Sequence, residues 1–369
     1  MKPQKHREEV TGMGSSLGRR FRITLFGEGG RHQLGAVLEG AEQGLSVDFQ
    51  RVSAAVSRYF TLRGKYAAGL KDLPGTVRVV SGVQEGCTTG TPITLLADNM
   101  NVEKQSQELV LEPGGPQFIS LARYGEISST GGMGHLSHSL QIPLVAAGEV
   151  ARQLLAERYS VLVGSHFASV GRVRDRRFDP VQLELDLLEK LSYRSLPLIR
   201  PGGEQLVEEE ISAAAHKGET VGCTVECAVL NLRAGVGSPL FDGVESCISR
   251  ALFALPTVRG VEFGDGFPMA EKWGTQTADA YCESGGSIRT YTNCQGGLSY
   301  GVTNGMPVVF RCAVAPMGRP RARMSVLDYL TREESERGGD VYYNPCAALC
   351  ALPLVEALTC ITLLDLLQE

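Results

Sequence analysis

Hydrophobic and polar positions along the chain follow two different periods, which predicts a fold that mixes strands and helices. Runs rich in β-branched and aromatic residues predict strands at 21–27, 76–82, 92–98, 161–173, 221–232 and 305–316. Apolar residues three or four positions apart predict helices at 46–60, 144–159, 181–194, 204–219 and 350–367. Because the two kinds of element alternate and no segment reads as a linker, we expect a single domain of the α/β (α+β) class.

The composition excludes several classes of protein. With 43% hydrophobic and 21% charged residues, the 369-residue chain can form a core. Its net charge of -5 lacks the basic excess of most nucleic-acid-binding proteins. No apolar run reaches the roughly 18 residues of a membrane span, and residues 1–12 lack the apolar core of a secretory signal. We therefore expect a cytoplasmic protein with a disordered tail at 1–12 and a domain at 13–369.

The ten cysteines are scattered along the chain. Cys223 and Cys227 are four residues apart, as are Cys346 and Cys350, and neither pair has the spacing of a zinc site. We interpret the cysteines as reduced, mostly buried thiols and expect no metal site.

Four segments rich in glycine and polar residues are candidate binding loops: 26–35, 129–139, 291–307 and 315–325. The first carries Glu28 and His32 but lacks the glycine spacing of a dinucleotide-binding loop. In the second, His135 and His138 precede a helix, where imidazoles and backbone amides can contact phosphate or transfer protons. The last contains Arg319 and two further arginines that can hold an anion. Each segment is also compatible with a purely structural loop, so together they indicate only an anion-binding enzyme.

Longer segments resemble the chorismate synthase family from about Met13 to the C-terminus. Eight ordered blocks carry the resemblance: MGSSLGRRFRITLFGE, SGVQEGCTTGTPI, GHLSHSLQIPLVAAGEVARQLLA, GSHFASVGRV, VECAVLNLRAGVGSPLFDGVES, LFALPTVRGVEFGDGF, GGLSYGVTNGMPVVFR and ALPLVEAL. The resemblance implies a β-α-β sandwich with helices between the sheets, a homotetramer, and reduced FMN as cofactor. It also implies conversion of 5-enolpyruvylshikimate 3-phosphate to chorismate by an anti-1,4-elimination of phosphate and a proton.

The positions at which the family carries charged or acid–base groups differ in this chain. The family's G-E-S-H-G signature reads GEGGR at 27–31, and Ala315 stands at a phosphate-binding lysine. Tyr342, Tyr343 and Asn344 stand at the arginine, the histidine and the catalytic aspartate of G-R-H-D-P-C. Each lost charge-assisted contact costs ~1.5–3 kcal/mol. Because apolar and glycine positions are kept, we infer a folded protein with an altered site.

The resemblance assigns candidate roles by position in the family's motifs. The candidate catalytic residues are Glu28, His32, His135, Tyr342 and Tyr343. The candidate cofactor-binding residues are Ser137, Gly296, Gly297, Thr303, Asn304 and Arg319. The candidate substrate-binding residues are Arg58, Arg63, His138 and Asn344. The expected partners are a small-molecule ligand and further copies of the chain or a family member, with no nucleic acid and no membrane.

Three hypotheses about function follow. The first, which the replaced residues favour, is a lyase-type enzyme with an FMN-like pocket and altered chemistry on a shikimate-type ligand. The second is a non-catalytic paralogue that acts as a structural or regulatory subunit. The third is a genuine chorismate synthase with relocated groups, in which His32 and His135 replace the lost histidines and Glu28 supplies a carboxylate. Only the third hypothesis requires the chain to bind FMN.

Overall fold

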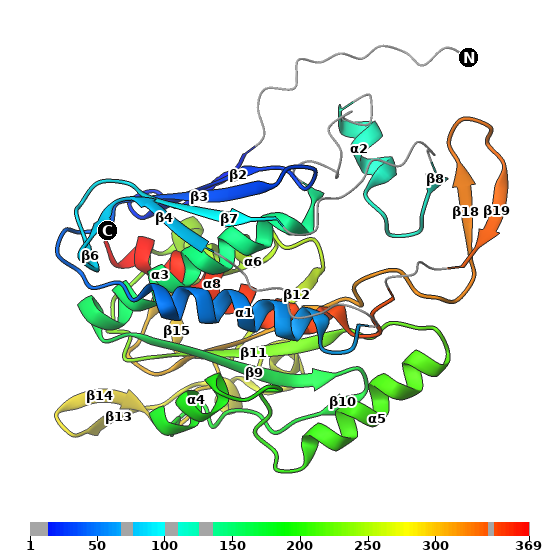
Figure 1. Cartoon of the computed structure of the whole chain (residues 1–369). Coiled ribbons are helices and arrows are strands. Elements are labelled where there is room, and N and C mark those ends of the chain that lie inside the picture. Colours follow the sequence, from blue (N-terminus) through cyan, green and yellow to red (C-terminus); the bar gives the residue numbers. More distant parts are fainter. Residues whose placement is uncertain (1–13, 68–76, 100–109, 125–135, 339–342, 369) are drawn as a thin grey trace.

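Two five-stranded antiparallel sheets enclose a layer of helices in the computed structural model (Figure 1), which describes residues 14–67, 77–99, 110–124, 136–338 and 343–368. The first sheet has the order β1 (Ser16–Leu17), β2 (Arg22–Gly27), β3 (Gln33–Glu39), β7 (Ile93–Asp98), β4 (Val77–Ser81). The second has the order β10 (Val173–Arg174), β9 (Leu162–Val170), β11 (Cys223–Leu230), β17 (Val308–Val314), β12 (Val258–Phe263). The expected β-α-β sandwich is therefore confirmed.

The middle layer consists of α1 (Phe49–Gly64), α3 (Gln141–Tyr159), α6 (Val244–Leu252) and α8 (Ala351–Leu367). Helix α8 is apolar on nearly all sides, which is the pattern of a helix buried in a core. It packs closely on α3, since a Cβ added to Gly148 would lie 2.1 Å from the Cβ of Ala357. The core of the molecule therefore lies along the contact between α3 and α8.

One helix is long and apolar enough to cross a membrane by length and composition, which differs from the expectation that no such run exists. It spans Ala347–Leu367, and 94% of its most apolar window is buried inside the protein. Its two acidic residues, Glu356 and Asp365, both have partners within the chain. The segment is a core helix in this structure.

The strands and helices expected from the hydrophobic pattern are present, with boundaries shifted by a few residues. The prediction missed β1, β3 and β12 of the two large sheets and helix α6 of the middle layer. The outer helices are α2 (Gln117–Tyr124), α4 (Leu185–Ser192), α5 (Gly203–His216) and α7 (Gly274–Thr277). The short strands are β5 (Val83–Gln84), β6 (Cys87–Thr88), β8 (Val110–Leu111), β13 (Tyr281–Ser284), β14 (Ser287–Thr290), β15 (Leu298–Ser299), β16 (Val302–Thr303), β18 (Met324–Asp328) and β19 (Glu334–Arg337).

The antiparallel strands and the middle helices give the sandwich two ends, which hold different loops (Figure 1). At one end α1 stops and α3 and α8 begin; this Arg63 end holds residues 27–33, 63–66, 136–141, 315–321 and 343–350. At the other end β17 begins and β12 stops; this Gly296 end holds residues 230–236, 264–266 and 296–307. Helix α3 runs from the Arg63 end to the Gly296 end.

Candidate functional site

A hydrogen-bonded series of side chains joins α1 to the start of α3 at the Arg63 end. Arg63 Nη1 donates to the Tyr59 hydroxyl oxygen at 3.1 Å, and that hydroxyl donates to Gln141 Oε1 at 2.9 Å. Because the Gln141 oxygen is the acceptor, its amide nitrogen is the donor to His138 Nδ1, at 3.3 Å. We call this series of four residues the Arg63–His138 relay. Because Nδ1 of His138 accepts this hydrogen bond, a neutral His138 imidazole carries its hydrogen on Nε2.

Burial and the nearby Arg63 guanidinium lower the pKa of His138 to about 4. The imidazole is therefore neutral near pH 7 and acts there as a hydrogen-bond donor through Nε2. His138 begins a short 3-10 helix (His138–Leu140) whose N-cap is Ser137, and the Ser137 hydroxyl accepts the backbone N–H of Ser139 at 3.1 Å. The cap fixes the position of His138 at the start of α3.

Asn344 ties the chain before α8 to the end of α1. Its side-chain nitrogen donates to the backbone carbonyl of Arg63, and its Oδ1 accepts the backbone N–H of Cys346 at 2.9 Å. The structure therefore brings together three of the four candidate substrate-binding residues, Arg63, His138 and Asn344, at one end of the sandwich.

The fourth, Arg58, points into the middle layer. Its Nη1 donates to Glu356 Oε2 at 2.8 Å, and Arg152 Nη2 donates to the same oxygen at 2.6 Å. Burial alone would raise the pKa of Glu356, but the two guanidinium groups and the Ser165 hydroxyl hold it below its usual value. The Nε and Nη2 atoms of Arg58 are buried and have no partner among the described residues.

Glu28 and His32 lie in the turn between β2 and β3, also at the Arg63 end. Glu28 forms a 3.9 Å ion pair with Arg31, and the His32 side chain is exposed. Asn99 organises this turn, because its side-chain nitrogen donates to the carbonyls of Gly29, at 2.8 Å, and Arg31, at 2.9 Å. The turn is thus anchored to the end of β7, and Glu28 remains partly exposed beside it.

Tyr343 and Arg319 also lie at this end. The Tyr343 hydroxyl donates to the carbonyl of Glu219, burial raises the pKa of Tyr343, and Arg321 lies 5.1 Å above its ring. Arg319 forms a 2.8 Å ion pair with Glu112, and its buried Nε has no partner among the described residues.

The predictions for His135 and Tyr342 fall outside the described residues.

The remaining cofactor-binding candidates lie at the Gly296 end. The Thr303 hydroxyl donates to the carbonyl of Arg233, and the Gly297 N–H donates to Asn293 Oδ1. Asn304 donates its backbone N–H to Gly297 and accepts that of Met306 through Oδ1. Seven residues of β17, roughly 23 Å at about 3.3 Å per residue, separate these loops from Arg319. One chain does not bring the two groups together.

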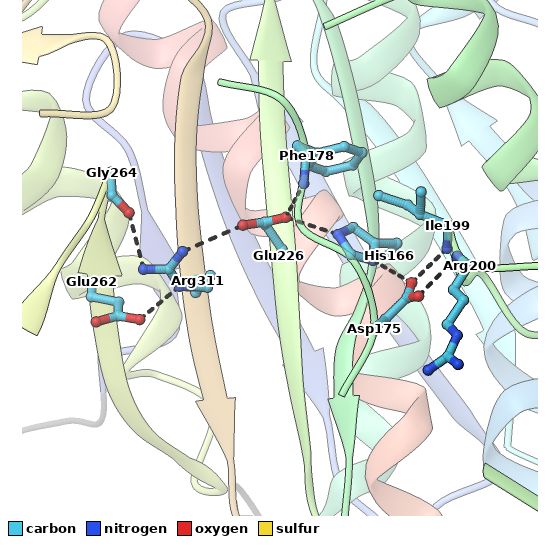
Figure 2. A network of polar contacts seen from close by, with 9 residues as sticks. All are labelled: His166, Asp175, Phe178, Ile199, Arg200, Glu226, Glu262, Gly264 and Arg311. Atoms are coloured by element: carbon cyan, nitrogen blue, oxygen red, sulfur yellow. Dashed lines mark hydrogen bonds and ion pairs between the residues drawn. The ribbon is translucent and has the colours of Figure 1, made fainter. Parts of the chain in front are cut away.

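A second polar network crosses the second five-stranded sheet from β9 to β12 (Figure 2). His166 bonds through Nδ1 to Asp175 at 3.2 Å and through Nε2 to Glu226 at 2.9 Å. Glu226 also pairs with Arg311 at 3.5 Å, and Arg311 donates to Glu262 at 2.6 Å. Direct cross-strand pairing places His166, Glu226, Arg311 and Glu262 side by side on β9, β11, β17 and β12.

Sequence reasoning missed Gln141, Asn99 and Glu356. Gln141 directly precedes the apolar run at the start of α3, and Glu356 interrupts the apolar run of α8. A polar residue in such a place often marks a buried hydrogen bond or ion pair. Asn99 follows a buried strand and precedes a polar stretch. Their partners lie up to 298 residues away along the chain, so the sequence could indicate an unusual position but not the contact.

A family model described as chorismate synthase matches residues 21–368. The chain belongs to the chorismate synthase family. A chorismate synthase of Aeropyrum pernix is 34% identical over 359 residues, which cover 95% of this chain and 92% of that protein. One of Dehalococcoides mccartyi is 30% identical over 368 residues, covering 96% of each. A solved structure titled crystal structure of chorismate synthase shares the fold, with a TM-score of 0.76 and 24% identity over 95% of this chain and 93% of that one.

Proposed function

We propose that this chain is a phosphate-eliminating carbon–oxygen lyase that converts 5-enolpyruvylshikimate 3-phosphate to chorismate and phosphate. The family match over nearly the whole chain supports this third hypothesis of the sequence analysis over the first, altered chemistry. The observation that carries the proposal is the Arg63–His138 relay, which places the Arg63 guanidinium and the Nε2–H of His138 at the same end of the sandwich. A substrate with a phosphate and two carboxylates needs such donors.

Each residue at the Arg63 end has a part in this proposal. Arg63 binds an anionic group of the substrate, and His138 donates a hydrogen bond from its neutral imidazole. Arg58, predicted to bind substrate, instead joins α1 to α8 through its ion pair with Glu356. Glu28 is the carboxylate at this end that we propose as acceptor of the substrate's proton. Tyr59 and Gln141 position His138 and do not touch the substrate.

Arg319 and Ser137 fit a phosphate-bearing cofactor, because a buried guanidinium nitrogen that has no partner among the described residues lies at the same end as the N-cap of the 3-10 helix. In this family reduced FMN lends an electron transiently and is not consumed. Gly296, Gly297, Thr303 and Asn304 would contact the same cofactor only from a neighbouring chain.

The test is anaerobic incubation of the purified chain with reduced FMN and 5-enolpyruvylshikimate 3-phosphate, with chorismate and phosphate measured separately. We expect equal amounts of the two products, and none without reduced flavin. Arg63→Met should lower kcat/KM at least about tenfold, since it removes a charge-assisted contact. Lys190→Met, at an exposed lysine of α4, should leave it unchanged.

One observation favours a second candidate function, altered chemistry or a non-catalytic role. Both polar atoms of the Asn344 amide are used within the chain, and the Tyr343 hydroxyl is as well, at the positions of the family's aspartate and histidine. Tight FMN binding without chorismate formation would support altered chemistry. No FMN binding would support a structural or regulatory subunit.

A further inference from the structure

A cavity of about 130 Å³ lies between the N-terminal strand, α6 and the second half of α8. Leu17, Ile361 and Leu366 form its apolar wall. Twelve residues of helix, at about 1.5 Å each, separate Thr362 in this wall from Cys350 at the Arg63 end. The cavity is therefore distinct from the candidate active site, and what it binds does not depend on the proposed function.

Thr362 lines this cavity and has an unsatisfied hydroxyl. Its residue is 7% exposed, and its Oγ1 has no hydrogen-bond partner among the described residues. Thr359, one turn earlier on the same helix, donates its hydroxyl to the Val355 carbonyl at 2.7 Å, which is the usual arrangement for a buried helical threonine. The cavity wall thus contains a hydrogen-bonding group that the protein does not itself satisfy.

The charges around the cavity are balanced within the chain with one exception. Arg19 forms a two-fold ion pair with Asp242, at 3.0 and 3.2 Å. The Asp365 carboxylate accepts three consecutive backbone N–H groups, from Arg19, Arg20 and Phe21. Arg250 is exposed, lines the cavity, and forms no ion pair within the described part of the chain. Its guanidinium is the cation left for an incoming anion.

We propose that this cavity binds a small carboxylate anion with an apolar body. The carboxylate would pair with Arg250, Thr362 would supply a hydrogen bond, and Leu17, Ile361 and Leu366 would contact the hydrocarbon. The volume suits a single ring, because an apolar cavity of about 150 Å³ accepts benzene. Benzoate is a suitable probe, and benzamide has the same shape without the charge.

Calorimetric titration of the full chain with benzoate tests the site. We expect one benzoate per chain. Arg250→Gln should weaken binding at least about tenfold, and Thr362→Val, of the same shape, about threefold to tenfold. Benzamide should bind at least about tenfold more weakly than benzoate. Arg123→Gln, at an exposed arginine of α2, is the matched control and should not change the affinity.

Cys247 gives an independent readout of occupancy, since its half-buried thiol lines the cavity. Saturating benzoate should slow its alkylation by iodoacetamide, measured by mass spectrometry, and leave the exposed Cys87 unaffected. The proposal is wrong if no saturable binding is seen, if Arg250→Gln binds as tightly as the parent chain, or if bound benzoate does not protect Cys247.

Discussion

Glu356 shows how much one buried charge depends on residues distant in sequence. It is 3% exposed and accepts hydrogen bonds from Arg58, Arg152 and Ser165, which belong to three different elements. An ion pair that has lost water is stable only if its geometry and its further hydrogen bonds compensate. Here one carboxylate pairs with two guanidinium groups and accepts a hydroxyl, so α1, α3, β9 and α8 are joined at a single point.

Glu356→Gln should therefore be strongly destabilising. The substitution leaves two buried guanidinium groups facing a neutral amide, and removal of one partner from a buried pair costs about 3–5 kcal/mol. The free energy of unfolding from urea titration is the measurement. Glu189→Gln, at an exposed glutamate of α4, is the matched control and should change it by less than about 0.5 kcal/mol. Equal stability of the two variants would contradict this account.

The contact between α3 and α8 depends on the absence of a side chain at Gly148. A glycine inside a helix ordinarily destabilises it by about 0.5–1 kcal/mol relative to alanine. At this position, however, an added Cβ would lie 2.1 Å from the Cβ and 2.4 Å from the Cα of Ala357. The close approach of the two helices, which buries both, explains why glycine is favourable here.

Gly148→Ala is therefore expected to destabilise the protein by about 1–3 kcal/mol, the cost of overpacking a core. Gly274→Ala, in α7, has no atom within 4 Å of the added Cβ and should be neutral or slightly stabilising. Thermal unfolding is the measurement. The Tm of Gly148→Ala should fall, and the Tm of Gly274→Ala should stay the same or rise slightly. A stabilised Gly148→Ala variant would show that α3 and α8 can separate without cost.

The sequence predicted the long elements because their patterns are local. Helix α8 and strand β11 are largely apolar, and α1 has buried residues at helical spacing. Strand β3 was missed because its leading glycine-rich turn dominates the pattern, and the contact of Gly35 with the Phe26 ring and β7 is not visible locally. In the candidate site, the sequence indicated His138 and Arg63 but could not supply Tyr59 and Gln141 as the link between them.

At the scale of the whole molecule, the predicted cofactor-binding residues divide between the two ends of the sandwich. If FMN contacts both groups, different chains must supply them. Arg319→Met and Asn304→Ala chains should then each bind FMN poorly, and a re-equilibrated mixture should recover part of the binding, since some sites contain neither substitution. Flavin fluorescence measures the recovery. A mixture no better than the mean of its components would place the complete site in one chain.

Two buried histidines should give the stability of the whole molecule opposite pH dependences. The pKa of His138 is lowered to about 4 by burial and by Arg63, so its contribution is complete above pH 6.5 and is lost as pH falls toward 4. For His166, burial alone would lower the pKa, but the hydrogen bonds to Asp175 and Glu226 raise it above 6.5. Its contribution is complete below pH 6.5 and is lost as pH rises from 6.5 through the raised pKa of the folded protein.

Together these two groups predict greatest stability near pH 6.5. His138→Gln should flatten the acid limb by up to about 3 kcal/mol, because each unit of pKa difference corresponds to about 1.4 kcal/mol. His166→Gln should flatten the alkaline limb while lowering stability overall, since Asp175 and Glu226 lose their shared donor. His216→Gln, on the surface of α5, serves as control. The free energy of unfolding measured from pH 4 to 9 decides the point, because an unchanged acid limb in His138→Gln would mean that burial and Arg63 do not hold that imidazole neutral.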